Sequence, residues 1–179
     1  MLIFNDKQKG NKHTYMKNRI NKSLTIASVQ MPVSKKKTEN LKIMENYLKH
    51  INNLFPNMDM VVFPELSPTS IGAEPQDEAE KIPGSLTLTF SSWSKKYNIW
   101  LIPGSIYELS NGKVYNSTPV FSPDGNLVGS YKKRYPWSPY EKTEPGNQPF
   151  VFKIKGLIVY LKKKRFLLKG LFMLWVSDT

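Results

Sequence analysis

Short apolar segments alternate along the chain with stretches of helical periodicity, and this order constrains the fold more than any other feature of the sequence. Three of these segments have the β-branched residues and flanking prolines that are typical of buried strands. They are LTIASVQMP at 24–32, MDMVVFPE at 58–65 and NIWLIPGSIYE at 98–108. Residues 113–133 are predicted to form two further strands, joined by a Ser-Pro-Asp-Gly turn in which Gly125 supplies a positive φ. With helices between the first three strands, this order predicts an α/β layered domain with a mixed sheet.

Two helices are predicted between these strands. Over residues 38–55, apolar side chains recur at steps of three and four, which is the spacing of one helix face. This face consists of Leu41, Met44, Leu48, Ile51 and Phe55. Thr38 is expected to cap the start of this helix. The second helix is predicted over residues 84–97, and its apolar side consists of Leu86, Phe90 and Trp93.

The net charge of +12 is concentrated at the two ends of the chain. Residues 1–22 carry six Lys or Arg and one acid, residues 153–179 carry seven and one, and the part between carries thirteen against twelve. A dedicated nucleic-acid-binding domain carries its positive patch on the folded body, so no specific nucleic-acid partner is predicted. The first residues lack the apolar core of a signal peptide, and no segment has the length and apolarity of a membrane span, so a cytoplasmic protein is expected.

The sequence contains no cysteine and only two histidines, His13 and His50. Disulfides, thiolate metal sites and thiol nucleophiles are therefore excluded within these 179 residues. A zinc site built from imidazoles is not expected either, and no metal or other cofactor is predicted.

Two charged residues follow predicted strands and are the first candidates for a functional site. Glu65 ends VVFPE and Lys133 ends LVGSYKK, and ligands of open α/β sheets bind beyond the carboxyl ends of strands. Taken singly, each residue is compatible with an exposed surface position. Together they are compatible with a catalytic role, because a desolvated lysine near a glutamate could keep its charge and stabilise a developing oxyanion.

From about residue 24 to residue 156 the chain resembles the carbon–nitrogen hydrolase (nitrilase) superfamily, and is most like its aliphatic amidase and formamidase branch. The resemblance rests on motifs in a fixed order: IASVQMP, FPEL, LIPGSIYE, VYNSTPVFSPDG and GSYKKRYPWSPYEKTEPG. It implies a four-layer α-β-β-α sandwich, of which this chain holds an incomplete N-terminal part, and subunits that pair into homo-oligomers. It also implies a small amide as the substrate, hydrolysed to acid and ammonia without a cofactor.

The same resemblance implies catalytic roles for three residues. Glu65 matches the family's general base, and Lys133 matches its oxyanion-stabilising lysine. Glu141, at the end of PWSPYE, matches a second glutamate that helps to position substrate and base. The prolines and tryptophan of PWSP are then expected to hold Lys133 and Glu141 around one small amide.

Four further residues are placed by the resemblance. Trp137 falls where the amidase branch has an aromatic wall of the acyl pocket, and Tyr140 is predicted to contact the substrate with it. Tyr115 and Asn116 match a motif that is interpreted as structural.

The nucleophile of the family is absent from this sequence. In the family, a cysteine thiolate attacks the amide carbonyl, and its motif is expected after FVFKIKG. Tyr160 could be the tyrosine of that motif, but no cysteine separates it from Val159. No histidine partner is available for the serines that could replace it, which are Ser67, Ser138 and Ser177. We therefore predict a Cys-Glu-Lys site that lacks its nucleophile, and little or no amide hydrolysis.

Three segments are predicted along the chain. They are a basic flexible extension (1–22), a partial carbon–nitrogen hydrolase domain (23–156) and an aberrant basic and apolar tail (157–179). The pattern of the tail fits no clean strand or helix, and a deletion or frameshift near residue 157 would produce such a change. A chain truncated in this way would leave one sheet of the sandwich without its partner, so exposed apolar strand faces are expected.

Two other functions are compatible with the sequence. One is a non-catalytic homologue that binds a small amide or pairs with a full-length subunit. The other is a basic protein that uses its two ends to bind nucleic acid or a membrane surface, and it predicts salt-sensitive binding. Both rank below the hydrolase-type site.

Overall fold

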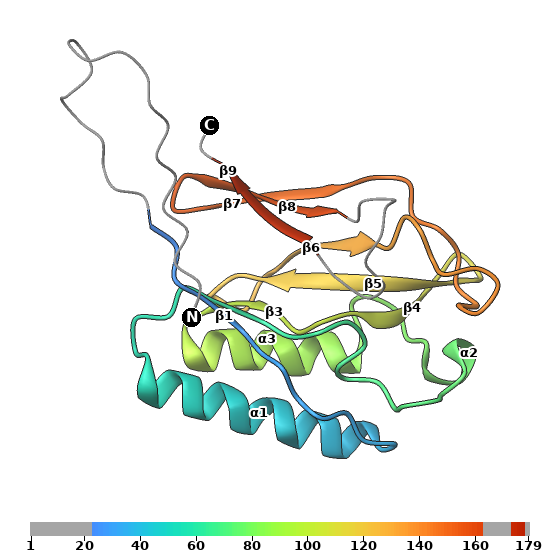
Figure 1. Ribbon diagram of the computed structural model, residues 1–179, viewed down its shortest axis with the longest axis horizontal. Helices are drawn as coiled ribbons and strands as arrows, with labels where there is room; N and C mark the ends of the chain where they lie inside the picture. Colours follow the sequence, from blue (N-terminus) through green and yellow to red (C-terminus); the bar gives the residue numbers. More distant parts are fainter. Residues whose placement is uncertain (1–22, 163–172, 178–179) are drawn as a thin grey trace, which may run out of the picture.

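The computed structural model describes residues 23–162 and 173–177, which form three stacked layers (Figure 1). Helices α1 (Lys37–Leu54) and α3 (Ser85–Tyr97) form the outer layer, and the short α2 (Pro75–Glu78) lies at one end. A six-stranded sheet forms the middle layer, and a three-stranded sheet covers its other face. The predicted α/β fold with a mixed sheet is confirmed.

The middle sheet combines parallel and antiparallel strands. Its strands are β1 (Ile26–Ser28), β2 (Met60–Val62), β3 (Trp100–Ile102), β4 (Ile106–Ser110), β5 (Lys113–Phe121) and β6 (Leu127–Lys132). β1, β2 and β3 run parallel, whereas β5 is antiparallel to β3, β4 and β6. The second sheet is antiparallel, in the order β7 (Phe150–Ile154), β8 (Leu157–Lys162) and β9 (Met173–Ser177).

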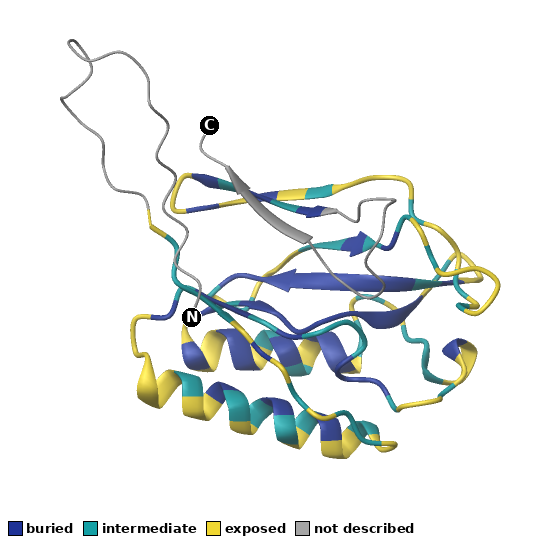
Figure 2. Ribbon diagram, in the orientation of Figure 1, coloured by how far each residue is buried: buried dark blue, intermediate teal, exposed yellow. Residues whose placement is uncertain are grey.

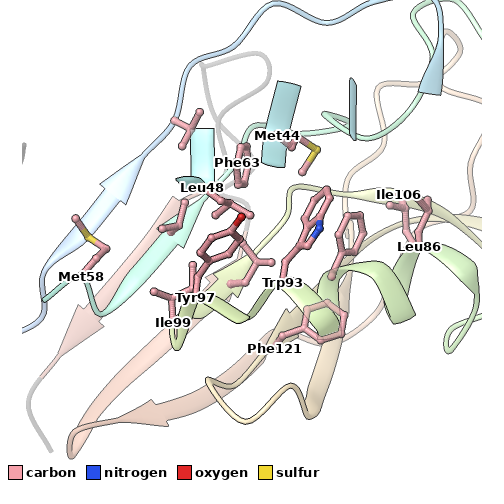
Figure 3. Packing of buried hydrophobic residues seen from close by; sticks show 14 residues of the cluster. Met44, Leu48, Met58, Phe63, Leu86, Trp93, Tyr97, Ile99, Ile106 and Phe121 are labelled. Carbon is pink, nitrogen blue, oxygen red and sulfur yellow. The ribbon is translucent and has the colours of Figure 1, made fainter. Parts of the chain in front are cut away.

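The apolar faces of α1 and α3 pack on one side of the middle sheet. Met44 and Leu48 of α1 and Phe90 of α3 are at most 1 % exposed, and they form one cluster with side chains of β2 and β3 (Figure 3). Each helix turns its buried side to the sheet and its exposed side outward (Figure 2). A fully buried side chain of this size contributes about 1.5–3 kcal/mol, so this cluster fixes the helical layer on the sheet.

A second apolar cluster lies between the two sheets. The middle sheet contributes Met60, Ile102, Val120 and Tyr131, and the second sheet contributes Phe152, Ile154, Val159 and Leu161. All eight side chains are at most 6 % exposed. The expectation that a sheet lacks its partner is therefore wrong for the middle sheet, which is covered on both faces.

Two elements begin or end differently from the sequence prediction. The predicted strand 98–108 is divided into β3 and β4, because Gly104 has a φ of 82° and lies against Pro64, where an added Cβ would be 2.0 Å from the carbonyl oxygen. Helix α1 begins at Lys37, so Thr38 lies inside it and does not cap it. Instead, Asn40 accepts a hydrogen bond from the Ser34 main-chain N–H at 2.6 Å and holds the entering chain.

Two apolar segments also differ from prediction. Phe55 follows the last residue of α1 and is 46 % exposed, so it does not belong to the buried helix face. Residues 157–162 form β8, although their pattern was predicted to fit no strand, because every second side chain from Leu157 to Leu161 is buried between the sheets. The predicted extension 1–22 and residues 163–172 of the predicted tail lie outside the described residues.

The contact between the sheets can be tested at Gly129 of β6. A Cβ at this position would lie 2.4 Å from the ring of Phe150, so Gly129→Ala should displace this ring from its contact with β6. We expect a loss of about 1–3 kcal/mol in the free energy of unfolding, measured by urea denaturation. Ser130→Ala is the matched control and should change stability by less than about 0.5 kcal/mol. An unchanged urea midpoint for Gly129→Ala would contradict this packing.

Candidate active site

The carboxyl ends of β2 and β6 lie at the same edge of the middle sheet. β2 is parallel to β3, and β5 is antiparallel to both β3 and β6, so β2 and β6 run in the same direction. Glu65 follows β2 by three residues, and Lys133 follows β6 directly. The topology therefore brings together two residues that are far apart in the sequence, as the strand-end argument predicted.

The turn that carries Glu65 is held against the bend between β3 and β4. Leu66 has a φ of 56°, which is the left-handed region that non-glycine residues seldom adopt. Its main-chain N–H donates to the Ser105 hydroxyl at 3.1 Å, and the Ser67 hydroxyl donates to the Pro64 carbonyl at 2.6 Å. These bonds fix the direction in which the Glu65 side chain leaves the chain.

The loop after β6 returns Glu141 to Lys133. The Glu141 main-chain N–H donates to the Trp137 carbonyl at 2.8 Å, and the Trp137 N–H donates to Oε2 of the Glu141 carboxylate at 3.0 Å. The Gly146 N–H then donates to the Lys133 carbonyl at 2.9 Å. The PWSP corner is thus a small hydrogen-bonded unit with Glu141 as its anchor.

Lys133 lies between the two carboxylates. Its Nζ is 2.7 Å from Glu65 Oε1 and 2.5 Å from Glu141 Oε2. The side chains of Lys133, Glu65 and Glu141 are 7 %, 16 % and 14 % exposed, so the ion pairs are largely shielded from water. These are the three catalytic residues predicted from the sequence, and in the structure they lie in one cluster. Their catalytic roles stay a prediction.

Asn116, predicted from the sequence only as part of a structural motif, is a fourth member of the cluster. This fully buried residue lies on β5 and donates from Nδ2 to Oε1 of Glu65 at 2.8 Å and to Oε1 of Glu141 at 2.9 Å. Its polar side chain inside a long, mostly buried strand was the signal in the sequence, since a buried amide requires partners. Its neighbour Tyr115 instead lies under Lys132, whose Nζ is 4.0 Å from the ring centroid.

The cluster shifts the pKa values of two of its members. Burial alone would lower the pKa of Lys133, but the hydrogen bonds to Glu141 and Glu65 outweigh it and raise the pKa above the usual 10.5. Burial would likewise raise the pKa of Glu141, yet hydrogen bonds from Lys133, the Trp137 backbone and Asn116 together lower it below the usual 4.5. Lys133 and Glu141 are therefore both charged at neutral pH.

One acceptor and one donor of the cluster are not used by any residue in the described part of the chain. Glu65 Oε1 accepts from both Lys133 and Asn116, whereas Glu65 Oε2 has no such partner. The Lys133 ammonium has three N–H bonds, and two of them point to the glutamates. Glu65 thus has an unused carboxylate oxygen, and its ion-pair partner Lys133 has an unused ammonium N–H.

Trp137 and Tyr140 do not lie inside this cluster. Their rings contact each other, with centroids 4.6 Å apart, and they are 52 % and 72 % exposed. The main-chain N–H of Trp137 donates to the Glu141 carboxylate. The two rings therefore form an exposed aromatic surface on the loop beside the cluster, and their contact with a substrate stays a prediction.

Val159 and Tyr160, which flank the position expected for the nucleophile, both lie on β8. Val159 is fully buried between the sheets, and Tyr160 is partly exposed. No group of three His, Asp or Glu side chains within residues 23–162 and 173–177 could hold a metal ion. A search of the same residues finds no helix with the length and apolarity needed to cross a membrane.

Comparisons with known proteins agree with this arrangement. The carbon-nitrogen hydrolase family model matches residues 25–157. Omega-amidase NIT2 of Danio rerio is 40 % identical over 110 residues, which are 60 % of this chain and 39 % of the relative. Omega-amidase NIT2 of Homo sapiens is 36 % identical over 112 residues, 62 % of this chain and 40 % of the relative. The crystal structure of a carbon-nitrogen hydrolase from Helicobacter pylori G27 aligns with a TM-score of 0.63 and 26 % identity over 71 % of this chain and 46 % of that chain.

The family match extends over most of the chain, so this chain belongs to the carbon-nitrogen hydrolase family. The predicted superfamily is thereby confirmed. The aliphatic amidase and formamidase branch stays a prediction, because the curated relatives described here are named omega-amidases. The chain spans about two fifths of the length of these curated relatives, at 39 % and 40 %.

The pKa shifts predict how stability depends on pH. A lowered Glu141 pKa stabilises the folded state above the unfolded value near 4.5, and this contribution is lost as the pH falls through the folded pKa. A raised Lys133 pKa stabilises the folded state below 10.5 and is lost as the pH rises through its folded value. We expect the urea midpoint to be highest between these limits and to fall from pH 5 toward pH 3.

The acid side of this dependence can be assigned by substitution. Glu141→Gln should flatten the fall in the urea midpoint below about pH 4.5, because the titrating group is gone. Glu144→Gln is the matched control, since Glu144 forms a 3.3 Å ion pair with Lys113 but is 48 % exposed. It should keep the slope of the wild type. Identical slopes for all three proteins would show that Glu141 does not carry the effect.

Proposed function

We propose that the cluster of Glu65, Lys133 and Glu141 binds the carboxamide group of a small neutral amide. The observation that carries the proposal is the unused donor and acceptor on Lys133 and Glu65. A primary carboxamide offers the complementary pair, a carbonyl oxygen that accepts and an N–H that donates. Lys133 would donate its third N–H to the amide oxygen, and Glu65 Oε2 would accept from the amide nitrogen.

The charge of the cluster favours an amide over the corresponding acid. With both glutamates ionised, two negative charges surround one positive charge, so the cluster carries a formal charge of −1. A neutral amide adds no charge to this largely buried position. A carboxylate would add a second net negative charge and would place an acceptor against Glu65, which is unfavourable at low effective dielectric.

The roles of these residues in hydrolysis follow from family membership together with this geometry. Glu65 would act as the general base, Lys133 would stabilise the oxyanion, and Glu141 would hold the lysine and the loop in place. The sequence of this chain contains no cysteine to attack the carbonyl carbon. We therefore propose that this chain binds small amides and does not hydrolyse them.

Binding can be measured by isothermal titration calorimetry with propionamide as the probe. We expect saturable binding of propionamide and at least tenfold weaker binding of propionate at pH 7. Glu65→Gln should weaken propionamide binding by about tenfold or more, because the glutamine would lose the charged acceptor. Glu144→Gln is the control, because the Glu144 carboxylate is half exposed and pairs with Lys113 instead of Lys133, and this variant should bind as the wild type does. Equal affinities for amide and acid would disprove the proposal.

The absence of turnover is a separate prediction. Incubation of the pure chain with propionamide or formamide should release no ammonia above the rate of the buffer alone, because no thiolate is present. Ammonia release is measured with a coupled glutamate dehydrogenase assay. Release that follows the protein concentration and disappears in Lys133→Met would show that another group in this chain acts as the nucleophile.

A further inference from the structure

Asn116 contacts every charged member of the cluster. Its Nδ2 carries two hydrogens, one directed to Glu65 Oε1 at 2.8 Å and the other to Glu141 Oε1 at 2.9 Å. Its main-chain carbonyl accepts from the Lys133 N–H at 2.8 Å. The Lys133 ammonium bridges the same two carboxylates, so two nitrogen atoms and two carboxylates form a closed ring of hydrogen bonds.

We propose that Asn116 is a positioning residue that fixes the plane of the Glu65 carboxylate, so that one of its two equivalent oxygens faces an incoming ligand. Two donors, Asn116 and Lys133, converge on Glu65 Oε1 and leave Oε2 as the oxygen available to an incoming amide. Without the Asn116 donor, Lys133 alone would hold this carboxylate, and its plane would be free to turn about the side-chain bond. This inference rests on the proposed amide site and extends it to the residue that orients its acceptor.

The position of Asn116 in the sheet makes it suited to this task. Asn116 lies on β5, where it is paired with Tyr107 of β4. Its main-chain carbonyl accepts a hydrogen bond from the N–H of Lys133, the residue that follows β6. Asn116 is fully buried, and its Oδ1 accepts no hydrogen bond from the described residues. A buried amide with a costly unpaired oxygen is retained where its nitrogen has a specific use.

Other titratable groups face this part of the site. Tyr107 is buried, and burial together with the charges of Glu141, Glu78 and Glu65 raises its pKa, so it is neutral at physiological pH. Glu78 of α2 accepts hydrogen bonds from the Ser70 main-chain N–H at 3.3 and 3.2 Å. Glu78 is in turn paired with Lys37, whose Nζ lies 3.9 Å from its Oε2, so it adds no unpaired negative charge beside the cluster.

The proposal is tested by carboxyl ¹³C NMR titration of the full chain, with the wild type first. The Asn116 side-chain amide resonances should titrate together with the Glu141 carboxyl, to which Asn116 donates, and this measurement requires no variant. Asn116→Ala should raise the midpoint of the Glu141 carboxyl, because one of the hydrogen bonds that lower the Glu141 pKa is lost. Asn116→Asp, which keeps the shape but replaces the donor with a carboxylate oxygen, should raise it further.

Thr118→Val is the matched control, because Thr118 is equally buried on β5 and its hydroxyl has no partner among the described residues. It should leave the midpoints unchanged. Asn116→Ala should also weaken propionamide binding at least fivefold. It should shift the loss of binding at acid pH to a higher pH, whereas Thr118→Val should have neither effect. Asn116 amide resonances that ignore the carboxyl titration would overturn the assignment. If the wild type binds no propionamide, the proposed function fails, while the titration still decides the role of Asn116.

Discussion

A buried ammonium group is the constraint on which the rest of this site depends. Lys133 is only 6 % exposed, and a lone charge there would cost several kcal/mol in lost hydration. Glu65 and Glu141 offset this cost, but two carboxylates around one ammonium leave an excess negative charge that needs further donors. Asn116 and the Trp137 main chain supply them. The turn after β2, the interior of β5 and the loop after β6 are arranged to complete this coordination.

The layers on both faces of the middle sheet hold its strands in place, and with them the edge of the sheet at which the charged cluster lies. The helices cover one face of the middle sheet and the second sheet covers the other, so the strands bearing the site cannot slide without opening one of two apolar clusters. Gly104 and Gly129 are two positions where neighbouring segments leave no room for a side chain, one against Pro64 in the Glu65 turn and one against the ring of Phe150. The relative positions of the charged side chains are thus fixed by packing in other parts of the fold.

Sequence patterns predicted most of the elements and the charged residues of the site. Apolar periodicity located both helices, because their buried faces repeat with the helical period. Strand-end position and family motifs identified Glu65, Lys133 and Glu141. The division of 98–108 and the strand at 157–162 were missed, because they depend on a contact with Pro64 and on pairing with β7. Asn116 was interpreted only as structural, because its place in a buried strand shows that it needs partners but not that they are Glu65 and Glu141 from distant segments.

The wide spacing of the cluster in the sequence has a consequence for how the chain acquires its structure. Glu65 and Lys133 are separated by 68 positions, and Asn116 and Glu65 by 51, so none of these contacts can form within a local unit. Each requires the closure of a long loop, whose entropic cost is met only when the intervening strands have paired. The cluster must therefore assemble late, and a nascent chain has no complete site until residue 141 has left the ribosome and the sheet has closed around it.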